Sequence, residues 1–270
     1  MIPTRHDQAE SWLAEEYVQV NADQVGSALA ALDLVPELIG AGGLLADVGC
    51  GAGEVAVAMA RRGMTVHASD VSPSMVAATR RLAAGLPVTA TVQNANELEL
   101  TPGAFTVVHS SWVLHWVARG VAAVRTMARA VRPGGALVLQ YCHSQPLAEG
   151  PGMARVYQDV AGRPRWRERL AGLPFAHQQH PAEVVADVIE EEGLEIVGCE
   201  DPTSFAKGRR SGPPDLEAAR RQVRLTGFAV HARALGEDRD AFVDELIVEA
   251  HQSGRSDPQG VRIIARRPGR

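Results

Sequence analysis

The segment from Leu44 to Glu54 constrains the fold of this chain more than any other. A short apolar run, interrupted only by Asp47, leads into three glycines at alternate positions, and a helical pattern follows at once. Gly49, Gly51 and Gly53 let the backbone turn sharply and let a ligand approach without a Cβ in the way. A strand, a glycine-rich turn and a helix in this order predict the first unit of an α/β sheet with a ligand at its edge.

The same alternation of strand and helix continues along the chain. Apolar runs predict strands at 44–48, 65–69, 88–92, 105–110 and 136–141, and helical patterns separate them. Ser72 as N-cap and Pro73 at the first helical position predict a helix over 72–84. A helix near 121–131 is expected to stop at the turn formed by residues 132–135. Strands separated by helices of this length indicate an α/β fold with a doubly wound, mostly parallel sheet.

Two long segments depart from this rhythm. Residues 144–180 are rich in proline and carry a basic stretch, whereas residues 202–258 have a largely helical pattern before a last strand near 262–265. Excursions of this length from a compact sheet are usually lids or binding segments. We therefore expect an N-terminal helical cap (1–40), a cofactor-binding core (41–143), a lid insertion (144–180), and the remainder of the sheet (181–270) with a helical insertion on the substrate side.

Composition excludes several classes of partner. The 270 residues include 27 basic and 32 acidic side chains, for a net charge of −5, which is unlike the basic footprint of a nucleic-acid-binding protein. No apolar run reaches the length of a spanning helix, and the N-terminus lacks a secretory pattern, so a cytoplasmic protein without a membrane partner is expected. The three cysteines are widely spaced and no His, Asp and Glu cluster has ligand spacing, so no metal site is predicted.

The spacing and composition of the glycine turn limit the classes of ligand that it can bind. Its spacing is G-x-G-x-G, not the G-x-G-x-x-G of dinucleotide sites, and the absence of a Lys-Ser/Thr pair excludes a P-loop. Asp70 stands at the end of the second predicted strand, where a carboxylate can accept hydrogen bonds from both ribose hydroxyls. Asn94 and Ser110 fall at the ends of two further strands. A nucleoside-like ligand is expected at this edge, because ligands of open α/β sheets bind at the carboxyl ends of the strands.

At this point the chain resembles the class I S-adenosylmethionine-dependent methyltransferases. The resemblance rests on five blocks in order, residues 47–53, 68–75, 93–98, 105–110 and 131–137. It implies a Rossmann-like sheet of seven strands, the last one antiparallel, and S-adenosylmethionine as cofactor with S-adenosylhomocysteine as product. Asn94 stands where the family often has an acid that binds the adenine amino group. The implied cofactor-binding residues are Asp47, Gly49, Cys50, Gly51, Gly53, Asp70, Val71, Met75, Asn94, Ala95, Asn96 and Ser110.

A narrower resemblance concerns the acceptor. Residues 110–117 are similar to the corresponding segment of the trans-aconitate and juvenile hormone acid methyltransferases, which methylate carboxylates. In that group a glutamine of the N-terminal helices and a later tryptophan help to hold the substrate carboxylate. Carried over to this chain, the resemblance implies Gln24 and Trp116, with Gln19 as an equal alternative to Gln24.

The identity of the acceptor decides whether a general base is needed. A carboxylate is ionised at neutral pH and needs none, whereas a phenol or alcohol would need one, for which His115 and His143 are the candidates. The candidate catalytic residues are thus His115, His143, Trp116 and Gln24. Arg163, Arg165 and Arg167 of the lid could be solvated or could anchor an acidic substrate group.

The sequence therefore predicts methyl transfer to an oxygen, either of a carboxylate or of a hydroxyl, on a small organic molecule or secondary metabolite. The protein is expected to act as a monomer or a homodimer. Transfer to carbon or nitrogen is an alternative, because the same core supports it. A protein that binds the cofactor but catalyses a cyclisation or another non-methylating reaction is a further alternative.

Overall fold

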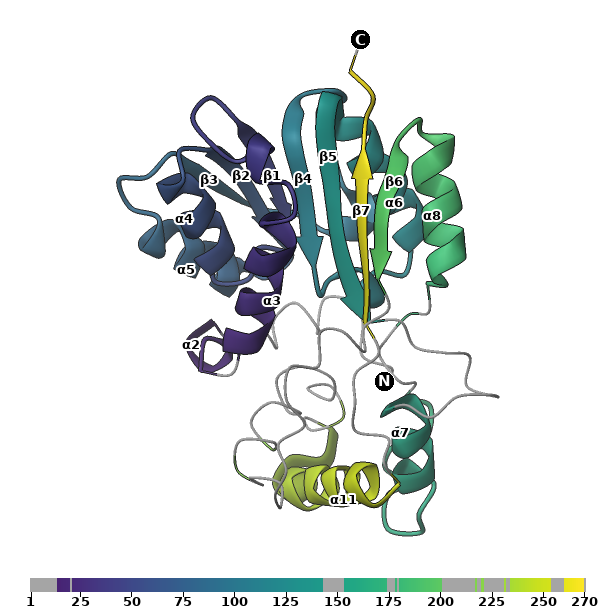
Figure 1. Ribbon diagram of the computed structural model, residues 1–270. Coiled ribbons are helices and arrows are strands. Elements are labelled where there is room, and N and C mark those ends of the chain that lie inside the picture. Colours follow the sequence, from purple (N-terminus) through teal and green to yellow (C-terminus); the bar gives the residue numbers. More distant parts are fainter. Residues whose placement is uncertain are drawn as a thin grey trace.

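One mixed sheet forms the centre of the molecule (Figure 1). A computed structural model describes residues 14–19, 21–142, 153–173, 178, 180–200, 217, 220, 231, 234–253 and 260–269. The seven strands lie in the order β3-β2-β1-β4-β5-β7-β6, and β7 runs antiparallel to both of its neighbours while the other described pairs are parallel. The strands are β1 (Leu44–Val48), β2 (Thr65–Asp70), β3 (Val88–Val92), β4 (Phe105–Ser111), β5 (Val131–Cys142), β6 (Glu195–Glu200) and β7 (Gly260–Arg266). The predicted α/β class, the mostly parallel sheet and the antiparallel last strand are confirmed.

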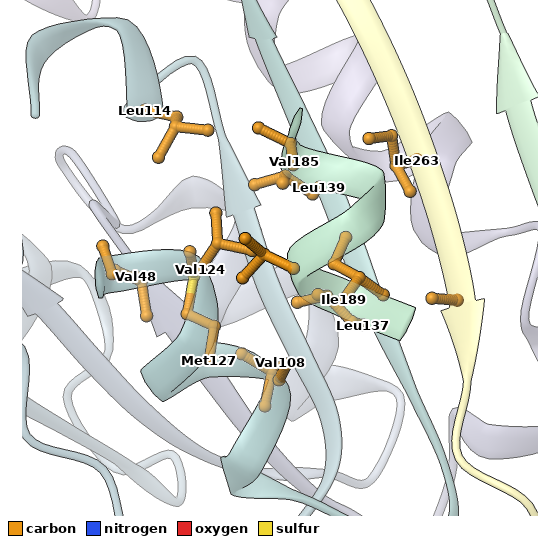
Figure 2. Close-up of a cluster of buried hydrophobic side chains, with 14 of the residues drawn as sticks. Val48, Val108, Leu114, Val124, Met127, Leu137, Leu139, Val185, Ile189 and Ile263 are labelled. Atoms are coloured by element: carbon orange, nitrogen blue, oxygen red, sulfur yellow. The ribbon is translucent and has the colours of Figure 1, made fainter. Parts of the chain in front are cut away.

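Helices cover both faces of the sheet because successive strand residues point to opposite sides. Val107 packs on the side of α3 (Ala22–Leu32) and α4 (Glu54–Arg61), where α5 (Pro73–Leu82) also lies. Its neighbour Val108 packs with α6 (Gly120–Ala130) and α8 (Ala182–Glu191) on the other side. Figure 2 shows this second cluster, in which Leu137 and Leu139 of β5 meet Ile189 of α8. The strands of the core are thus buried on both faces, as continuous apolar runs predict.

The residues at its N-terminus explain where the helix that follows β2 begins. The helix α5 (Pro73–Leu82) begins with proline, and Ser72 Oγ accepts a hydrogen bond from Met75 N at 3.4 Å. Both features agree with the predicted cap. The start of α5 lies directly after Asp70, so the cap also fixes the position of that carboxylate.

The prediction that residues 132–135 form a turn before the strand is wrong. The strand β5 already begins at Val131, so this segment is the first part of the strand. Its pairing with β4 shifts register between Phe105 and Val107, and Gly134 adopts a φ of 73° there. The glycines thus provide an irregularity within the strand, because they accept backbone angles that other residues avoid.

A small helical unit lies beyond the carboxyl ends of the parallel strands (Figure 1). It contains α7 (Met153–Ala161) and α11 (Arg239–Gln252), which pack around the fully buried Trp166 and Phe242. These helices fall within the two predicted insertions, although the domain boundaries stay a prediction. The remaining described elements are α2 (Ala14–Tyr17), η1 (Pro36–Leu38), η2 (Ala95–Glu97), η3 (Leu114–Trp116) and η5 (Gly236–Asp238).

Candidate functional site

The glycine turn after β1 needs its three glycines for two different reasons. All three have positive φ, 75° at Gly49, 55° at Gly51 and 97° at Gly53. A Cβ at Gly49 would lie 2.1 Å from a methyl group of Val113, and one at Gly53 would lie 2.8 Å from Thr79. A Cβ at Gly51 would instead meet only Tyr17, at 3.6 Å. Packing within the protein therefore requires the outer two glycines, whereas Gly51 leaves room for a ligand to approach the backbone.

Asp70 is bound to this turn. Its Oδ2 accepts a hydrogen bond from Gly51 N at 3.0 Å, and its Oδ1 accepts one from Ser72 N at 2.9 Å. Burial raises the pKa of Asp70 to about 6, against the lowering effect of these backbone hydrogen bonds, and the nearby Asp47 adds to the rise. Each carboxylate oxygen has two lone pairs, so both can still accept a hydrogen bond from a ligand hydroxyl.

A cavity opens between the glycine turn, the end of β4 and helix α3. Polar and apolar side chains line it together, and the only two lining residues that ordinarily carry a charge at neutral pH are the carboxylates Asp47 and Glu54. None of the described residues that line it is lysine or arginine. Such a surface favours a ligand that carries positive charge. The lining residues are Tyr17, Asn21, Gln24, Val25, Ala28, Asp47, Gly49, Cys50, Gly51, Glu54, Val55, His109, Ser111 and Trp112.

Asp47 is nearly inaccessible to solvent, yet only one of its oxygens is satisfied. His109 Nδ1 lies 2.8 Å from Asp47 Oδ1, and both side chains are 2% exposed. Asp47 Oδ2 has no hydrogen-bond partner within the described part of the chain. An unsatisfied buried carboxylate oxygen is costly, so this atom is suited to a ligand donor. His109 was not among the candidate residues, because it lies in an apolar run with no local pattern that marks it.

Gln24 lies at the cavity, and Gln19 does not. Tyr17 Oη donates a 2.6 Å hydrogen bond to Gln24 Oε1, and both residues line the cavity. Burial raises the pKa of Tyr17, and the nearby Asp70 and Glu54 add to the rise, so the phenol stays protonated. Gln19 is exposed and donates to Glu15 O at 3.1 Å. Of the two alternatives, the geometry therefore favours Gln24.

The tryptophan at the cavity is Trp112, whereas Trp116 is not among the lining residues. Trp112 has a φ of 62°, which is unusual for a bulky residue, and its Nε1 donates to Ser27 Oγ at 3.0 Å. Trp116 belongs to η3, where its ring lies 5.3 Å from that of His115. Trp112 lies within the resembling segment 110–117, but the resemblance implies a substrate-holding role for Trp116.

Of the two candidate bases, His115 lies within the described residues and is buried. His115 is 4% exposed, and its Nδ1 accepts a hydrogen bond from Cys142 N at 3.1 Å. That contact occupies one of the two ring nitrogens and gives His115 a role in joining η3 to β5. His143 lies outside the described residues.

The other predicted cofactor residues lie at the strand ends, in varied settings. Asn94 Oδ1 accepts hydrogen bonds from the backbone and side-chain nitrogens of Asn96, at 2.9 and 3.0 Å, and caps η2, which begins at Ala95. Ser110 Oγ donates to Val48 O at 2.9 Å and is buried. Their role in cofactor binding stays a prediction.

The remaining three lie along the turn and the start of α5. Burial raises the pKa of Cys50, and Asp47 and Asp70 add to the rise, so Cys50 is a neutral thiol at the cavity. Val71 is exposed directly after β2, whereas Met75 is 2% exposed and packs with Ala14 and Ala52. Val71 is thus the more accessible to a ligand of these two predicted cofactor-binding residues.

The arginines of the predicted lid contact acids of the same helical unit. Arg163 Nη1 lies 2.9 Å from Glu245, and its Nη2 lies 2.6 Å from Glu249, both on α11. Arg165 stacks on Trp166 at 4.3 Å and lies 3.4 Å from Asp238. These contacts join the residues just after α7 to η5 (Gly236–Asp238) and α11, which favours a structural role for Arg163 and Arg165.

No described helix is long and apolar enough to cross a membrane. Within the same part of the chain, no three His, Cys, Asp or Glu side chains come together as metal ligands would.

Comparison with known proteins identifies the core. Residues 46–139 match the family described as "Methyltransferase domain". The chain carries a class I S-adenosylmethionine-dependent methyltransferase domain. This confirms the resemblance of the sequence blocks and S-adenosylmethionine as the cofactor of the domain.

Similar proteins from two Xanthomonas species match part of the chain. Two proteins called "Ubiquinone biosynthesis O-methyltransferase", from Xanthomonas euvesicatoria pv. vesicatoria and Xanthomonas campestris pv. campestris, are 36% identical over 111 and 110 residues. The match covers 40% of this chain and 46% of each relative, so it spans about half of their length.

Solved methyltransferase-like structures match over almost the whole chain. The [4+2]-cyclase SpnF covers 100% of it, with 19% identity and a TM-score of 0.61. A geranyl diphosphate methyltransferase in complex with S-adenosylmethionine covers 98%, with 17% identity and a TM-score of 0.61. The matches cover 98% and 91% of those chains, respectively. At these identities the likeness shows the fold alone, and it includes the helical segments outside the methyltransferase domain.

Proposed function

We propose that this chain transfers a methyl group from S-adenosylmethionine to an oxygen of a small organic molecule. The observation that carries the proposal is the acidic cavity beside Gly51, in which the buried Asp47 Oδ2 has no partner within the described residues. S-adenosylmethionine carries an α-ammonium and a sulfonium, so a cavity lined by carboxylates and without described lysine or arginine suits it. The confirmed methyltransferase domain makes it the expected occupant.

From the order of the strands we infer a region for each part of the cofactor. Asp70 at the end of β2 would accept hydrogen bonds from the ribose hydroxyls. Asn94 and Ala95, after the neighbouring β3, would contact the adenine edge. The amino-acid end would then extend in the opposite direction, toward β1 and β4, where Asp47 offers its free oxygen.

The reaction requires little acid–base catalysis by the protein. The sulfonium supplies an electrophilic methyl group, so this chain must hold the acceptor oxygen in line with it and exclude water. Tyr17, Val25 and Trp112 line the cavity on the side of α2 and α3 and provide such a cover. The amide of Gln24, held by the Tyr17 hydroxyl, is the candidate hydrogen-bonding group for the acceptor.

Transfer to oxygen is supported by the named relatives, which are called O-methyltransferases. A carboxylate acceptor is favoured over a hydroxyl because the described histidine candidate, His115, already uses Nδ1 to accept from Cys142 N. A carboxylate needs no base. The acceptor is therefore proposed to be a small carboxylic acid, in agreement with the resemblance to the acid methyltransferases.

The test is incubation with methyl-labelled S-adenosylmethionine and a panel of small carboxylic acids and phenols. We expect label in an acid, and release of labelled methanol when the product is treated with alkali, because a methyl ester hydrolyses and an ether does not. Label that resists alkali would contradict the carboxylate acceptor but keep the methyltransferase. Absence of transfer to every acceptor, despite tight cofactor binding, would instead favour a non-methylating reaction.

A further inference from the structure

A row of hydrogen-bonded side chains crosses three strands next to the glycine turn. His109 Nδ1 lies 2.8 Å from Asp47 Oδ1, and His109 Nε2 lies 2.8 Å from Ser111 Oγ. Ser111 Oγ in turn donates to Gln140 Oε1 at 2.9 Å. Because a carboxylate has no proton to give, the Nδ1 of His109 is the donor to Asp47. The row thus connects the cavity to the interior of the sheet.

The strand register makes this row possible. Asp47 of β1 lies opposite His109 of β4, and Ser111 of β4 lies opposite Gln140 of β5. Residues two apart on a strand point to the same face, so all four side chains share the face that carries α3 and α4. Asp47, His109 and Gln140 are each at most 2% exposed. Well-packed strands therefore hold the imidazole in one orientation.

This arrangement leaves one atom of Asp47 for a ligand. Oδ1 is held by His109, and rotation of the carboxylate would break that hydrogen bond inside a buried site, which is energetically costly. Oδ2 is consequently fixed as the free acceptor, without a partner among the residues described. A preorganised acceptor binds a cation more tightly than one that must be reoriented.

The same three residue types, Asp, His and Ser, could suggest a hydrolytic nucleophile. The hydrogen bonding argues against it, since the Ser111 hydroxyl gives its proton to Gln140 Oε1 and not to His109. The row is therefore built to hold the histidine, with Asp47 at its end nearest the glycine turn.

We propose that His109 is a positioning residue that aims Asp47 Oδ2 at the α-ammonium group of the cofactor, and that Ser111 and Gln140 hold its imidazole in place. This inference rests on the proposed function. It assigns to β4 a role in cofactor affinity that is separate from the ribose contact of Asp70.

Two substitutions of His109 separate this role from simple packing. In His109→Asn the side-chain nitrogen lies near the position of Nδ1, so the donor to Asp47 is retained. In His109→Gln the nitrogen lies near the position of Nε2, so the contact with Ser111 is retained and the donor to Asp47 is lost. Both replace a buried imidazole by an amide, and each is therefore the control for the other.

The test is calorimetric titration of the wild-type and variant proteins with two ligands. S-adenosylhomocysteine has the α-ammonium, and 5′-methylthioadenosine lacks the whole amino-acid end while keeping the adenosine. We expect His109→Gln to weaken S-adenosylhomocysteine about 10- to 100-fold, as loss of a group that orients a ligating side chain does at metal sites. His109→Asn should stay within about threefold, and methylthioadenosine should bind all three proteins within about twofold.

A double-variant cycle keeps the inference testable if His109→Gln lowers stability. If His109 acts through Asp47, adding His109→Gln to Asp47→Asn will cause no further loss of S-adenosylhomocysteine affinity. Equal weakening of both ligands, equal loss in the two His109 variants, or additive losses in the cycle would overturn the inference. Failure of the wild-type protein to bind either ligand would overturn the proposed function and with it this inference, a result distinct from the other three.

Discussion

Gly51 N donates a 3.0 Å hydrogen bond to Asp70 Oδ2, so one carboxylate joins the end of β2 to the middle of the glycine turn. The same carboxylate accepts from Ser72 N at the start of α5. Asp70 thus holds the shape of the turn and is also the proposed acceptor for the ribose. Its protonation state will affect both.

Cofactor affinity is predicted to fall at mildly acidic pH. Burial raises the pKa of Asp70 to about 6, and the ionised form is the better acceptor of ribose hydroxyls. Between pH 7 and pH 5 the ionised fraction, and hence the affinity for S-adenosylhomocysteine, should fall about tenfold. Calorimetry across this range measures it. Asp70→Asn should bind weakly with much less dependence on pH, and an unchanged profile in that variant would assign the titration to another group.

The same shift has the opposite sign for the stability of the ligand-free protein. Because the folded state holds the Asp70 proton more tightly than the unfolded chain does, this residue stabilises the fold below pH 4, and the contribution is lost as the pH rises through about 6. Denaturant unfolding of the wild type and Asp70→Asn at pH 4.5 and 7 measures this contribution of Asp70 to the free energy of unfolding. The free energy of unfolding of the wild type should decline relative to the variant between those pH values.

The glycines of the turn should separate folding from binding. Gly53→Ala places a Cβ 2.9 Å from the backbone of Thr79 at a φ of 97°, which should lower the free energy of unfolding by about 2 to 4 kcal/mol. Gly51→Ala meets only Tyr17 and should cost about 1 kcal/mol, yet it should weaken S-adenosylhomocysteine at least about tenfold by filling the ligand's approach. Chemical unfolding and calorimetry on both variants measure the two effects. Normal cofactor affinity in Gly51→Ala would place the cofactor elsewhere.

Trp112 is predicted to influence the acceptor more than the cofactor. Its indole Nε1 donates to Ser27 Oγ at 3.0 Å, so Ser27→Ala leaves a half-buried donor unpaired. A loss of about 1 kcal/mol in positioning corresponds to about a fivefold higher KM for the acceptor, with the affinity for S-adenosylhomocysteine unchanged. Ser27→Thr retains the hydroxyl and is the matched control. A change in cofactor affinity with an unaltered acceptor KM would mean that Trp112 lies against the cofactor.

Arg163 is predicted to stabilise the helical unit without contacting substrate. It contacts Glu245 and Glu249 of α11, and partly exposed pairs of this kind contribute up to about 1 kcal/mol each. Arg163→Ala should therefore lower the free energy of unfolding by about 1 to 2 kcal/mol and leave the acceptor KM unchanged. The exposed Arg167 provides the comparison, because Arg167→Ala should change neither quantity. A higher acceptor KM in Arg163→Ala would instead indicate an anchor for an acidic substrate group.

The sequence predicted the features that depend on residues close together in the chain. The turn at Gly49 to Gly53, the cap of α5 by Ser72 and the position of Asp70 at the end of β2 follow from local spacing, and the structure has each of them. The edge strand β6 was not predicted from the sequence, because its residues alternate in burial and do not form an apolar run.

The features that depend on strand register could not be predicted in this way. His109 becomes a partner of Asp47 because two strands separated by more than 50 residues lie in register, and nothing beside His109 in the chain marks it. Trp112 reaches Ser27 through an unusual backbone angle, which no residue preference would predict for a bulky aromatic side chain. The ion pairs of Arg163 likewise require the packing of α11 against a segment some 80 residues earlier.

The most direct test of the proposed function is calorimetric titration of S-adenosylhomocysteine into the wild-type protein and Asp70→Ala at pH 7.5. We predict micromolar binding to the wild type, and at least about a tenfold loss in the variant through the missing ribose contacts. Absence of binding to the wild type, or equal affinity in the two proteins, would contradict a cofactor site built on the glycine turn and Asp70.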